Sequence, residues 1–416
     1  MAKIVIAGAG IVGLSTAFYL AQSGHQIVIV DRGDIKTGTS FGNAGYVSPS
    51  HFIPLATPGI VAQGLKWMLS SSSPFYIKPR LDLSLIKWGL TFWRRSGYET
   101  MKRNMPFLNE MLQMSRALTK EMHTQMNESF SFHESGCLML YINAETEKHE
   151  AEMAHDAAAF GIETKVLNAS GVQEMEPEVE VNVKGGVYYP IDAHVNPSEM
   201  MQSLHQYLLT AGVEFKLNTE IIGFEKTKGK ISKMITTQGD LEADEFILAA
   251  GSWLPDLCTK LNIDLMLQAG KGYSMTFQNL NNNLRHPSIL VDHRVATTPL
   301  GTDLRIGGTM EISGLKSPML IKRAQSIFNA TKMYYPNLPI SFPTKNKIWF
   351  GYRPLSPDGL PYLGRHTSCK NAIIVGGHAM LGISLAAATG KLVTELVNGS
   401  PMSMNIKPFD IERKYY

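Results

Sequence analysis

The sequence predicts an α/β fold with more than one domain, and three observations point to this class. The chain has 416 residues, which is more than one hydrophobic core usually holds. Its N-terminus runs from a short apolar stretch through closely spaced glycines to a second apolar stretch, the order typical of strand, turn, helix and strand. Two further apolar runs that end on glycine lie at 246–251 and 372–377. We therefore expect a parallel sheet assembled from separate segments.

The N-terminal segment has the pattern of a dinucleotide-binding unit. Residues 3–7 predict a buried strand, 14–22 a helix and 26–30 a second strand. Asp31 follows that strand, eighteen residues after Gly13, close to the spacing at which a carboxylate accepts hydrogen bonds from an adenosine ribose. A Rossmann-like domain is therefore expected, and at this point the residues leave FAD and NAD open as the ligand.

The glycines between these elements suit a bound pyrophosphate. Gly8 permits the tight turn out of the first strand, Gly10 lacks a side chain where the backbone must approach the phosphates, and Gly13 lets the helix pack on the strand. The phosphates then meet the N-terminus of the helix, whose unpaired N–H groups and positive dipole end face them. A chance glycine-rich turn is the alternative, and the flanking strands, helix and terminal acid argue against it.

Composition excludes several classes of function. Apolar residues make up 44% of the chain, charged residues 18%, and the net charge of +3 is not gathered into basic runs that would bind nucleic acid. Cys137, Cys258 and Cys369 form no Cys-x-x-Cys pair, so we expect no metal site, no disulfide framework and a cytoplasmic location. No apolar run is long enough to predict a membrane-spanning helix.

One stretch leaves peripheral membrane contact open, at the inner face of the membrane. Residues 59–95 mix aromatic and basic side chains in a pattern that could lie in a bilayer interface. The alternative, which we favour from the sequence, is that these aromatics pack onto a second domain. The residues concerned are Trp67, Trp88, Phe92 and Trp93, beside Lys66, Lys87, Arg94 and Arg95.

Segments far from the N-terminus also predict cofactor contacts. Residues 40–45 offer small side chains and amides that could hold a planar ring, and residues 246–253 predict a strand that ends on glycine before a helix. Residues 372–375 predict another strand, followed by a bare turn and a small-residue helix at 382–398. Classical NAD enzymes usually complete the site in one continuous unit, so this distribution favours FAD. The residues expected at FAD are Gly8, Gly10, Ile11, Val12, Gly13, Asp31, Arg32, Ser40, Asn43, Ala44, Gly45, Ala250, Gly251, Trp253, Gly377, His378, Leu381 and Gly382.

These motifs together resemble a known family over nearly the whole chain. They include the N-terminal glycines, Asn43-Ala44-Gly45, Gly272-Tyr273-Ser274, Gly307-Gly308-Thr309, Arg353-Pro354 and Gly376-Gly377-His378. The chain resembles the FAD-dependent D-amino acid oxidase superfamily, and within it most closely the bacterial D-amino acid dehydrogenases and their glycine oxidase relatives. Asp31 departs from the longer Glu common in the family at the ribose position.

The resemblance implies two domains and a reaction. Residues 1–75, 168–255 and 345–416 would form the FAD-binding domain, and residues 76–167 and 256–344 an α+β substrate domain with a mixed or antiparallel sheet. The implied activity is oxidative deamination of an amino acid, by hydride transfer from Cα to flavin N5, with a quinone or another carrier as electron acceptor. An oxygen-using oxidase of the glycine, sarcosine or D-proline type and a non-catalytic flavin electron-transfer module are the alternatives.

Arg353 is the candidate for binding the substrate carboxylate. A guanidinium binds a carboxylate through two parallel N–H bonds, which a Lys cannot do. The resemblance implies this role at Arg353-Pro354, and a surface salt bridge near Asp358 is the alternative. Tyr273 could donate to the carboxylate or simply anchor a sheet, and His51 could touch the substrate side chain. We expect Tyr352 to point away from Arg353, because neighbouring residues of a strand alternate, and we assign no general base.

Overall fold

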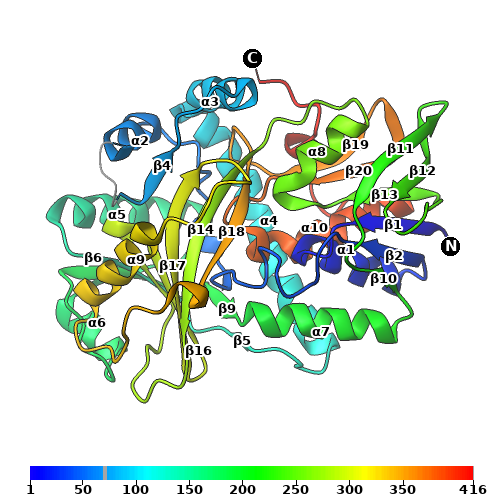
Figure 1. Ribbon diagram of the computed structural model, residues 1–416. Coiled ribbons are helices and arrows are strands. Elements are labelled where there is room, and N and C mark those ends of the chain that lie inside the picture. Colours follow the sequence, from blue (N-terminus) through cyan, green and yellow to red (C-terminus); the bar gives the residue numbers. More distant parts are fainter. Residues whose placement is uncertain (69–72, 416) are drawn as a thin grey trace.

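The computed structural model describes residues 1–68 and 73–415, and it has two parts side by side (Figure 1). A parallel sheet with its helices lies at one end, and a long, mainly antiparallel sheet lies at the other. Residues 70–72 of a serine-rich stretch that the sequence predicts as a loop lie outside the described residues. No helix of the described part is long and apolar enough to cross a membrane.

The parallel sheet confirms the predicted α/β class. Within the described residues it contains six strands, all parallel except for the edge strand β19. Strands β1 and β2 are adjacent, as the N-terminal pattern predicts, and β13 and β20 come from the two distant apolar runs. In spatial order the strands are β10 (Glu214–Lys216), β2 (Gln26–Val30), β1 (Lys3–Ala7), β13 (Glu245–Leu248), β20 (Cys369–Gly376) and β19 (Tyr362–His366).

Both faces of this sheet are buried, which explains why its strands are continuous apolar runs. Ile4 and Ile6 point to one face, which is covered by α1 (Ile11–Gln22), α10 (Gly382–Asn398), α7 (Pro197–Thr210) and α4 (Tyr98–Gln125). Val5 and Ala7 point to the other, where α8 (Leu254–Lys260) and the hairpin of β11 (Ile221–Thr227) and β12 (Lys230–Thr236) lie.

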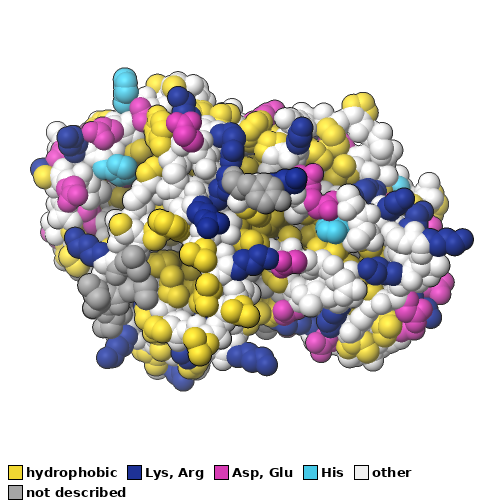
Figure 2. Space-filling view, turned by 90° about the horizontal axis from the view of Figure 1, so that it is seen from above, with side chains coloured by type: hydrophobic (Ala, Val, Ile, Leu, Met, Phe, Trp, Pro, Cys, Tyr) yellow, Lys and Arg dark blue, Asp and Glu magenta, His cyan; other side chains and the backbone are white. Residues whose placement is uncertain are grey.

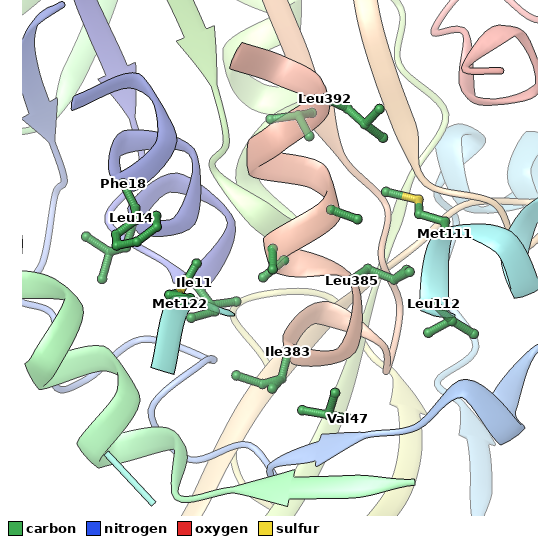
Figure 3. Packing of buried hydrophobic residues seen from close by; sticks show 14 of the residues in the cluster. Ile11, Leu14, Phe18, Val47, Met111, Leu112, Met122, Ile383, Leu385 and Leu392 are labelled. Atoms are coloured by element: carbon green, nitrogen blue, oxygen red, sulfur yellow. The ribbon is translucent and has the colours of Figure 1, made fainter. Parts of the chain in front are cut away.

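Helix α10 lies between α1 and α4, as the close-up in Figure 3 shows. Leu14 and Phe18 of α1, Leu385 and Leu392 of α10, and Met111 of α4 belong to one apolar cluster. Small side chains along α10 allow the close approach: a Cβ on Gly390 would lie 2.5 Å from the backbone oxygen of Ser15. This packing fixes the N-termini of α1 and α10 at the same edge of the sheet.

The second sheet, called here the mixed sheet, confirms the predicted mixed or antiparallel arrangement. Only the pairs β6–β15 and β4–β17 are parallel among the pairings that the described residues make in it. Its path is β18 (Ile348–Leu355), β14 (Gln268–Phe277), β17 (Asp303–Ile312), β16 (Val295–Leu300), β15 (Ser288–Leu290), β6 (Cys137–Tyr141), β8 (Gly185–Tyr189) and β7 (Lys165–Asn168), with β4 (Phe75–Ile77) beside β17.

Shorter elements complete the chain. A small sheet of β3 (Tyr46–Val47), β9 (Ala193–Val195) and β5 (Phe132–His133) lies between the two large sheets. The remaining helices are α2 (Ile60–Met68), α3 (Leu83–Arg95), α5 (Ala144–Ala157), α6 (Ala169–Met175) and α9 (Ile321–Tyr334), with short 3₁₀ turns that include η1 (Pro49–His51) and η3 (Gly251–Trp253).

Two strands that the predicted boundaries assign to the FAD-binding domain belong to the mixed sheet instead. Strand β8 falls in the segment 168–255 and β18 in the segment 345–416, both predicted for the FAD-binding domain, yet both pair within the mixed sheet. Their pairing is long-range, so it left no local signal in the sequence. We propose domain boundaries after β8 and after β18 in place of 167 and 344.

The contact between α1 and α10 leads to a stability prediction. We expect Gly390→Ala to lower the free energy of unfolding by about 1–3 kcal/mol, because its Cβ would overlap backbone atoms of Ser15 and Thr16. Gly89→Ala in α3 is the matched control, since its Cβ would meet nothing within 4 Å; it should stabilise by about 0.5–1 kcal/mol. Denaturant midpoints of both variants test this, and equal midpoints would contradict the packing.

Candidate active site

A cavity of about 320 Å³ opens where the carboxyl ends of the parallel strands face the mixed sheet. Ligands of open α/β sheets bind at this edge. The lining comes from the start, middle and end of the chain, as the distribution of motifs predicts. It includes residues 7–12, 30–40, 249–253, 352–354 and 375–383, though not every residue of each range.

The N-terminal glycines have the structural roles that their spacing predicts. Gly8 has φ +119°, and a Cβ there would lie 2.4 Å from the backbone oxygen of Ala249. A Cβ on Gly13 would lie 1.9 Å from the backbone oxygen of Gly8, so only glycine lets α1 sit this close to β1. Gly10 is different, because its Cβ would meet nothing nearer than Ser40 Oγ at 3.5 Å. The space above Gly10 is open for a ligand.

Asp31 holds the glycine loop as well as facing the cavity. Its Oδ2 accepts from the Ala9 N–H (2.7 Å) and its Oδ1 from the Gly33 N–H (2.8 Å). Ser40 Oγ accepts from the Ile11 N–H (3.0 Å), so this first-turn donor of α1 is already bonded within the protein. The other N–H groups at the start of α1 have no partner within the helix, which leaves donors for an anionic ligand.

Residues 40–45 form a loop that is held from the mixed sheet. The Arg305 guanidinium donates to the backbone oxygens of Asn43 (2.7 Å) and Phe41 (3.3 Å). Gly45 has φ +85°, and Asn43 Oδ1 accepts from its N–H (2.8 Å). Ser40 and Asn43 line the cavity, whereas Ala44 and Gly45 shape the loop beside it. Arg32 and Trp253 also line the cavity, and the Arg32 guanidinium lies 3.8 Å from the centre of the Trp253 ring.

The turn before α10 brings His378 to the cavity in its neutral form. Burial lowers the pKa of His378 to about 4. Thr389 Oγ1 donates to the Leu385 carbonyl (2.8 Å), so His378 Nε2 donates its proton to Thr389 Oγ1 (3.0 Å). Gly382 lines the cavity at the N-terminus of α10, where the dipole favours negative charge. Gly377, with φ +78°, and Leu381 form the turn without lining the cavity.

Arg353 presents an uncompensated charge to the cavity. Its guanidinium lies over Gly272 of β14, where a Cβ would be 2.2 Å from Nη1, and Nη1 donates to the Thr309 carbonyl. Burial lowers the pKa of Arg353 to about 10. Within residues 1–68 and 73–415 no carboxylate lies within 4 Å of it; Asp358, the predicted alternative partner, pairs with Arg413 (2.8 Å). A ligand carboxylate would supply the missing negative charge.

Tyr273 does not reach the cavity. It is 1% exposed, its hydroxyl donates to Glu311 Oε2 (2.7 Å) and accepts from the Leu320 N–H (3.0 Å). This is the sheet-anchoring alternative, and the carboxylate-binding role is wrong for this geometry. Tyr352 lies on the opposite face of β18 from Arg353, as alternation predicts, yet it lines the cavity. Its ring meets Trp253 edge-on at 5.6 Å between centroids.

His51 lies outside the cavity lining, in a buried hydrogen-bond chain. Ser50 Oγ donates to Asp192 Oδ2 (2.5 Å), so His51 Nδ1 donates to Ser50 Oγ (3.1 Å). Burial lowers the pKa of His51 to about 4 and raises that of Asp192 to about 7. The chain fastens η1 to the turn before β9. A contact between His51 and a substrate side chain stays a prediction.

Trp349 is a residue that the sequence reasoning missed. Its indole covers two glycines: a Cβ on Gly351 would lie 2.2 Å from it and a Cβ on Gly42 2.3 Å. Trp349, Gly351 and Arg353 alternate along β18, so the indole and the guanidinium share one strand face. The sequence pattern Trp-x-Gly-x-Arg could have indicated that these three residues share one strand face. Trp349 itself does not line the cavity. The lining residues that were not predicted are Ala7, Ala9, Val30, Gly33, Asp34, Ile35, Thr37, Gly38, Thr39, Thr219, Glu220, Ile221, Ala249, Ser252, Asp256, Leu257, Lys260, Tyr352, Pro354, Val375, Gly376, Ala379 and Ile383.

Comparison with known proteins decides the family. A family model described as FAD dependent oxidoreductase matches residues 3–396. The chain belongs to this FAD-dependent oxidoreductase family. FAD is therefore its cofactor, as the discontinuous motifs predict, and the open face of Gly10 and the unpaired donors of α1 fit its pyrophosphate.

Several curated relatives and solved structures are similar to this chain over nearly its whole length. A D-amino acid dehydrogenase of Helicobacter pylori is 34% identical over 399 residues, covering 95% of this chain and 94% of that protein. One of Granulibacter bethesdensis is 30% identical over 406 residues, covering 95% and 96%. Glycine oxidase of Bacillus cereus superposes with a TM-score of 0.78 at 21% identity, covering 100% of this chain and 99% of that one. L-Proline dehydrogenase of P. horikoshii superposes with a TM-score of 0.76 at 19% identity, covering 99% and 97%.

The open space above Gly10 leads to a prediction about FAD affinity. We expect Gly10→Ala to fold normally and to bind FAD at least about tenfold more weakly, because the methyl group would occupy the space for the pyrophosphate rather than clash with protein atoms. Gly364→Ala, whose Cβ would meet nothing within 4 Å, is the matched control. Flavin titration and the unfolding midpoint of the apoproteins measure the two effects. Full FAD affinity in Gly10→Ala would contradict this placement.

Proposed function

We propose that this protein is a D-amino acid dehydrogenase. It would oxidise the amino acid to an imino acid, which water hydrolyses to a 2-oxo acid and ammonia, and it would pass the electrons to a quinone or another carrier. The observation that carries the amino acid assignment is Arg353, a half-buried guanidinium that faces the cavity without an acidic partner among the described residues.

Arg353 suits an α-carboxylate by its shape and by its fixed position. The Thr309 carbonyl takes one N–H of the guanidinium, and the bare face of Gly272 supports its plane. The remaining N–H groups can bind two carboxylate oxygens in parallel, which determines the depth and the rotation of the bound molecule. A flavin protein that only carried electrons would have no use for such a group, so this geometry argues against the non-catalytic alternative.

The residues around the cavity need not supply a base. When bound, FAD supplies the two-electron oxidation by accepting the hydride of the substrate Cα. The nitrogen lone pair of a neutral amine forms the C=N bond as the hydride leaves, so no side chain must remove a proton from carbon. His378 fits this requirement, because burial keeps it neutral and its Nε2 proton is held by Thr389. The contribution of the chain is to position the substrate.

The configuration and the acceptor rest on the relatives. The curated proteins at 30–34% identity are named D-amino acid dehydrogenase, which supports a D-amino acid and an acceptor other than oxygen. The solved structures include both a glycine oxidase and an L-proline dehydrogenase below 25% identity, so their likeness speaks for the fold alone.

The direct test is anaerobic bleaching of the flavin. We expect D-amino acids to reduce the bound FAD, seen as loss of its visible absorption, while L-enantiomers leave it oxidised. Reoxidation by a quinone analogue but only slowly by air would support a dehydrogenase, and rapid reoxidation by air would replace it with an oxidase. If no amino acid in a panel of both enantiomers bleaches the flavin, the proposed function is wrong.

Arg353→Lys tests the residue that carries the proposal. We expect KM for the amino acid to rise about 10- to 100-fold with FAD still bound, because an ammonium cannot form the two parallel bonds. Arg285→Lys is the matched control, since Arg285 is an exposed residue that pairs with Glu178. Steady-state kinetics with an artificial dye and the flavin spectrum measure both. A KM in Arg353→Lys equal to that of the control would remove Arg353 from the substrate site.

A further inference from the structure

Helix α3 exposes a continuous apolar stripe. The spacing of its members is three or four residues, which places them on one face of the helix. Large apolar side chains rarely gather in this way on the surface of a soluble protein without a binding role. The members, called here the outer stripe, are Leu83 (85% exposed), Ile86 (48%), Leu90 (51%) and Trp93 (61%), with Leu81 (103%) just before the helix.

The opposite face of α3 is firmly attached to the protein. Leu85 and Trp88 are buried, Phe92 stacks on Trp88 at 4.9 Å between ring centroids, and the Trp88 indole N–H donates to the Leu355 carbonyl (2.9 Å). Asp82 caps the helix by accepting from the Ser84 N–H (3.0 Å) and the Leu85 N–H (3.2 Å). The sequence-based expectation is therefore half right: Trp88 and Phe92 pack inward, whereas Trp93 points outward.

The surroundings of the outer stripe are strongly basic. Residues 59–95 contain six Lys and Arg against a single acid, Asp82, a net charge of +5. The whole chain carries +3, so the remainder carries −2 and the positive charge is concentrated here. Lys66, Lys78 and Arg94 are exposed, whereas Lys87 is paired with Asp264. Figure 2 looks onto this side of the molecule and shows apolar side chains gathered among Lys and Arg.

We propose that the outer stripe of α3 docks this enzyme on an anionic lipid surface. Apolar side chains on one helix face enter the boundary between head groups and acyl chains, a tryptophan is favoured at that depth, and flanking basic residues bind acidic head groups. No spanning helix is required, and none occurs within the described residues. A second copy of this chain fits less well, because two such faces would bring like charges together.

This surface lies close to the cavity. Trp88 bonds to Leu355, which is two residues from Arg353, and Ala379 of the cavity lining packs on the same apolar cluster as Leu85 and Trp88. A membrane-dissolved acceptor would thus meet the enzyme on the side where the substrate site lies. This use of the surface for electron delivery rests on the proposed function, whereas the docking itself does not.

The experiment is co-sedimentation of the holoenzyme with lipid vesicles. Neutral phosphatidylcholine vesicles are compared with vesicles that contain phosphatidylglycerol, at low and high salt. We expect binding to the anionic vesicles, weakened by salt, with a blue shift of tryptophan fluorescence that Trp93→Phe reduces. Replacing exposed Lys66 and Lys78 by Gln should weaken binding roughly fivefold for each charge removed.

A triple variant isolates the apolar contribution. Ile86→Gln with Leu90→Gln and Trp93→Gln should lower binding at least about tenfold while keeping FAD and dye-linked turnover. The matched control is Leu209→Gln with Ile222→Gln and Met333→Gln, which removes three similarly exposed apolar side chains from other surfaces. The control should bind vesicles like the unaltered enzyme.

Each outcome decides the proposal. Absence of binding by the unaltered enzyme, or equal binding by the two triple variants, would overturn it. So would a change from dimer to monomer on sedimentation analysis of the α3 variant without lipid, which would assign the stripe to a second copy. Flavin bleaching by amino acids is measured on the same preparations, so a protein that binds vesicles but oxidises no amino acid refutes only the proposed function.

Discussion

The end of strand β18 is the constraint on which the site depends. Through β14 this strand belongs to the mixed sheet, yet its backbone is bonded to three segments from the other side of the cavity. The Tyr352 N–H donates to Thr39 Oγ1 (3.1 Å), the Tyr352 carbonyl accepts from Ser252 Oγ (3.0 Å), and the Pro354 carbonyl accepts from the Ala379 N–H (2.8 Å). Arg353 lies between these bonds. Its position relative to the FAD-binding segments is therefore set by backbone geometry rather than by a flexible side-chain contact.

This placement has an energetic cost in the free protein. Burial lowers the pKa of Arg353 to about 10, because the charged form loses solvation there. The Thr309 carbonyl offsets part of this cost, and a bound carboxylate can offset more. Functional sites commonly hold groups that are under-satisfied until the ligand arrives. The same reasoning explains why Tyr273 is unsuited to carboxylate binding, because its hydroxyl already has Glu311 and Leu320 as partners.

The sequence predicted the parts of the fold and site that are encoded locally. The roles of Gly8 and Gly13 follow from backbone contacts within one βαβ unit, and the motif residues that line the cavity follow from apolar runs that end on glycine. Long-range pairing was not readable. The sheet to which β8 and β18 belong depends on partners up to 87 residues away along the chain, as for Gln268 and Leu355, and neither strand differs locally from one of a parallel sheet. Trp349 was missed because its position matters only once β18 faces residues 40–45.

The handedness of the substrate is a separate problem from the fold. Under the proposed function, the substrate carboxylate would bind at Arg353 and the Cα hydrogen would face the cofactor. Two substituents of the carbon would then remain, the amine and the side chain. Exchanging the amine and the side chain converts a D- into an L-amino acid. Discrimination between the enantiomers must therefore come from protein side chains that accept the amine at one of the two positions and the substrate side chain at the other. The backbone cannot supply it, since solved structures of this fold include an L-proline dehydrogenase and L-amino acid deaminases. On the strand face of Arg353, Trp349 is the other large side chain, and its indole covers Gly351 and Gly42. Under the proposed function, selectivity would therefore depend on individual side chains around the cavity rather than on the fold.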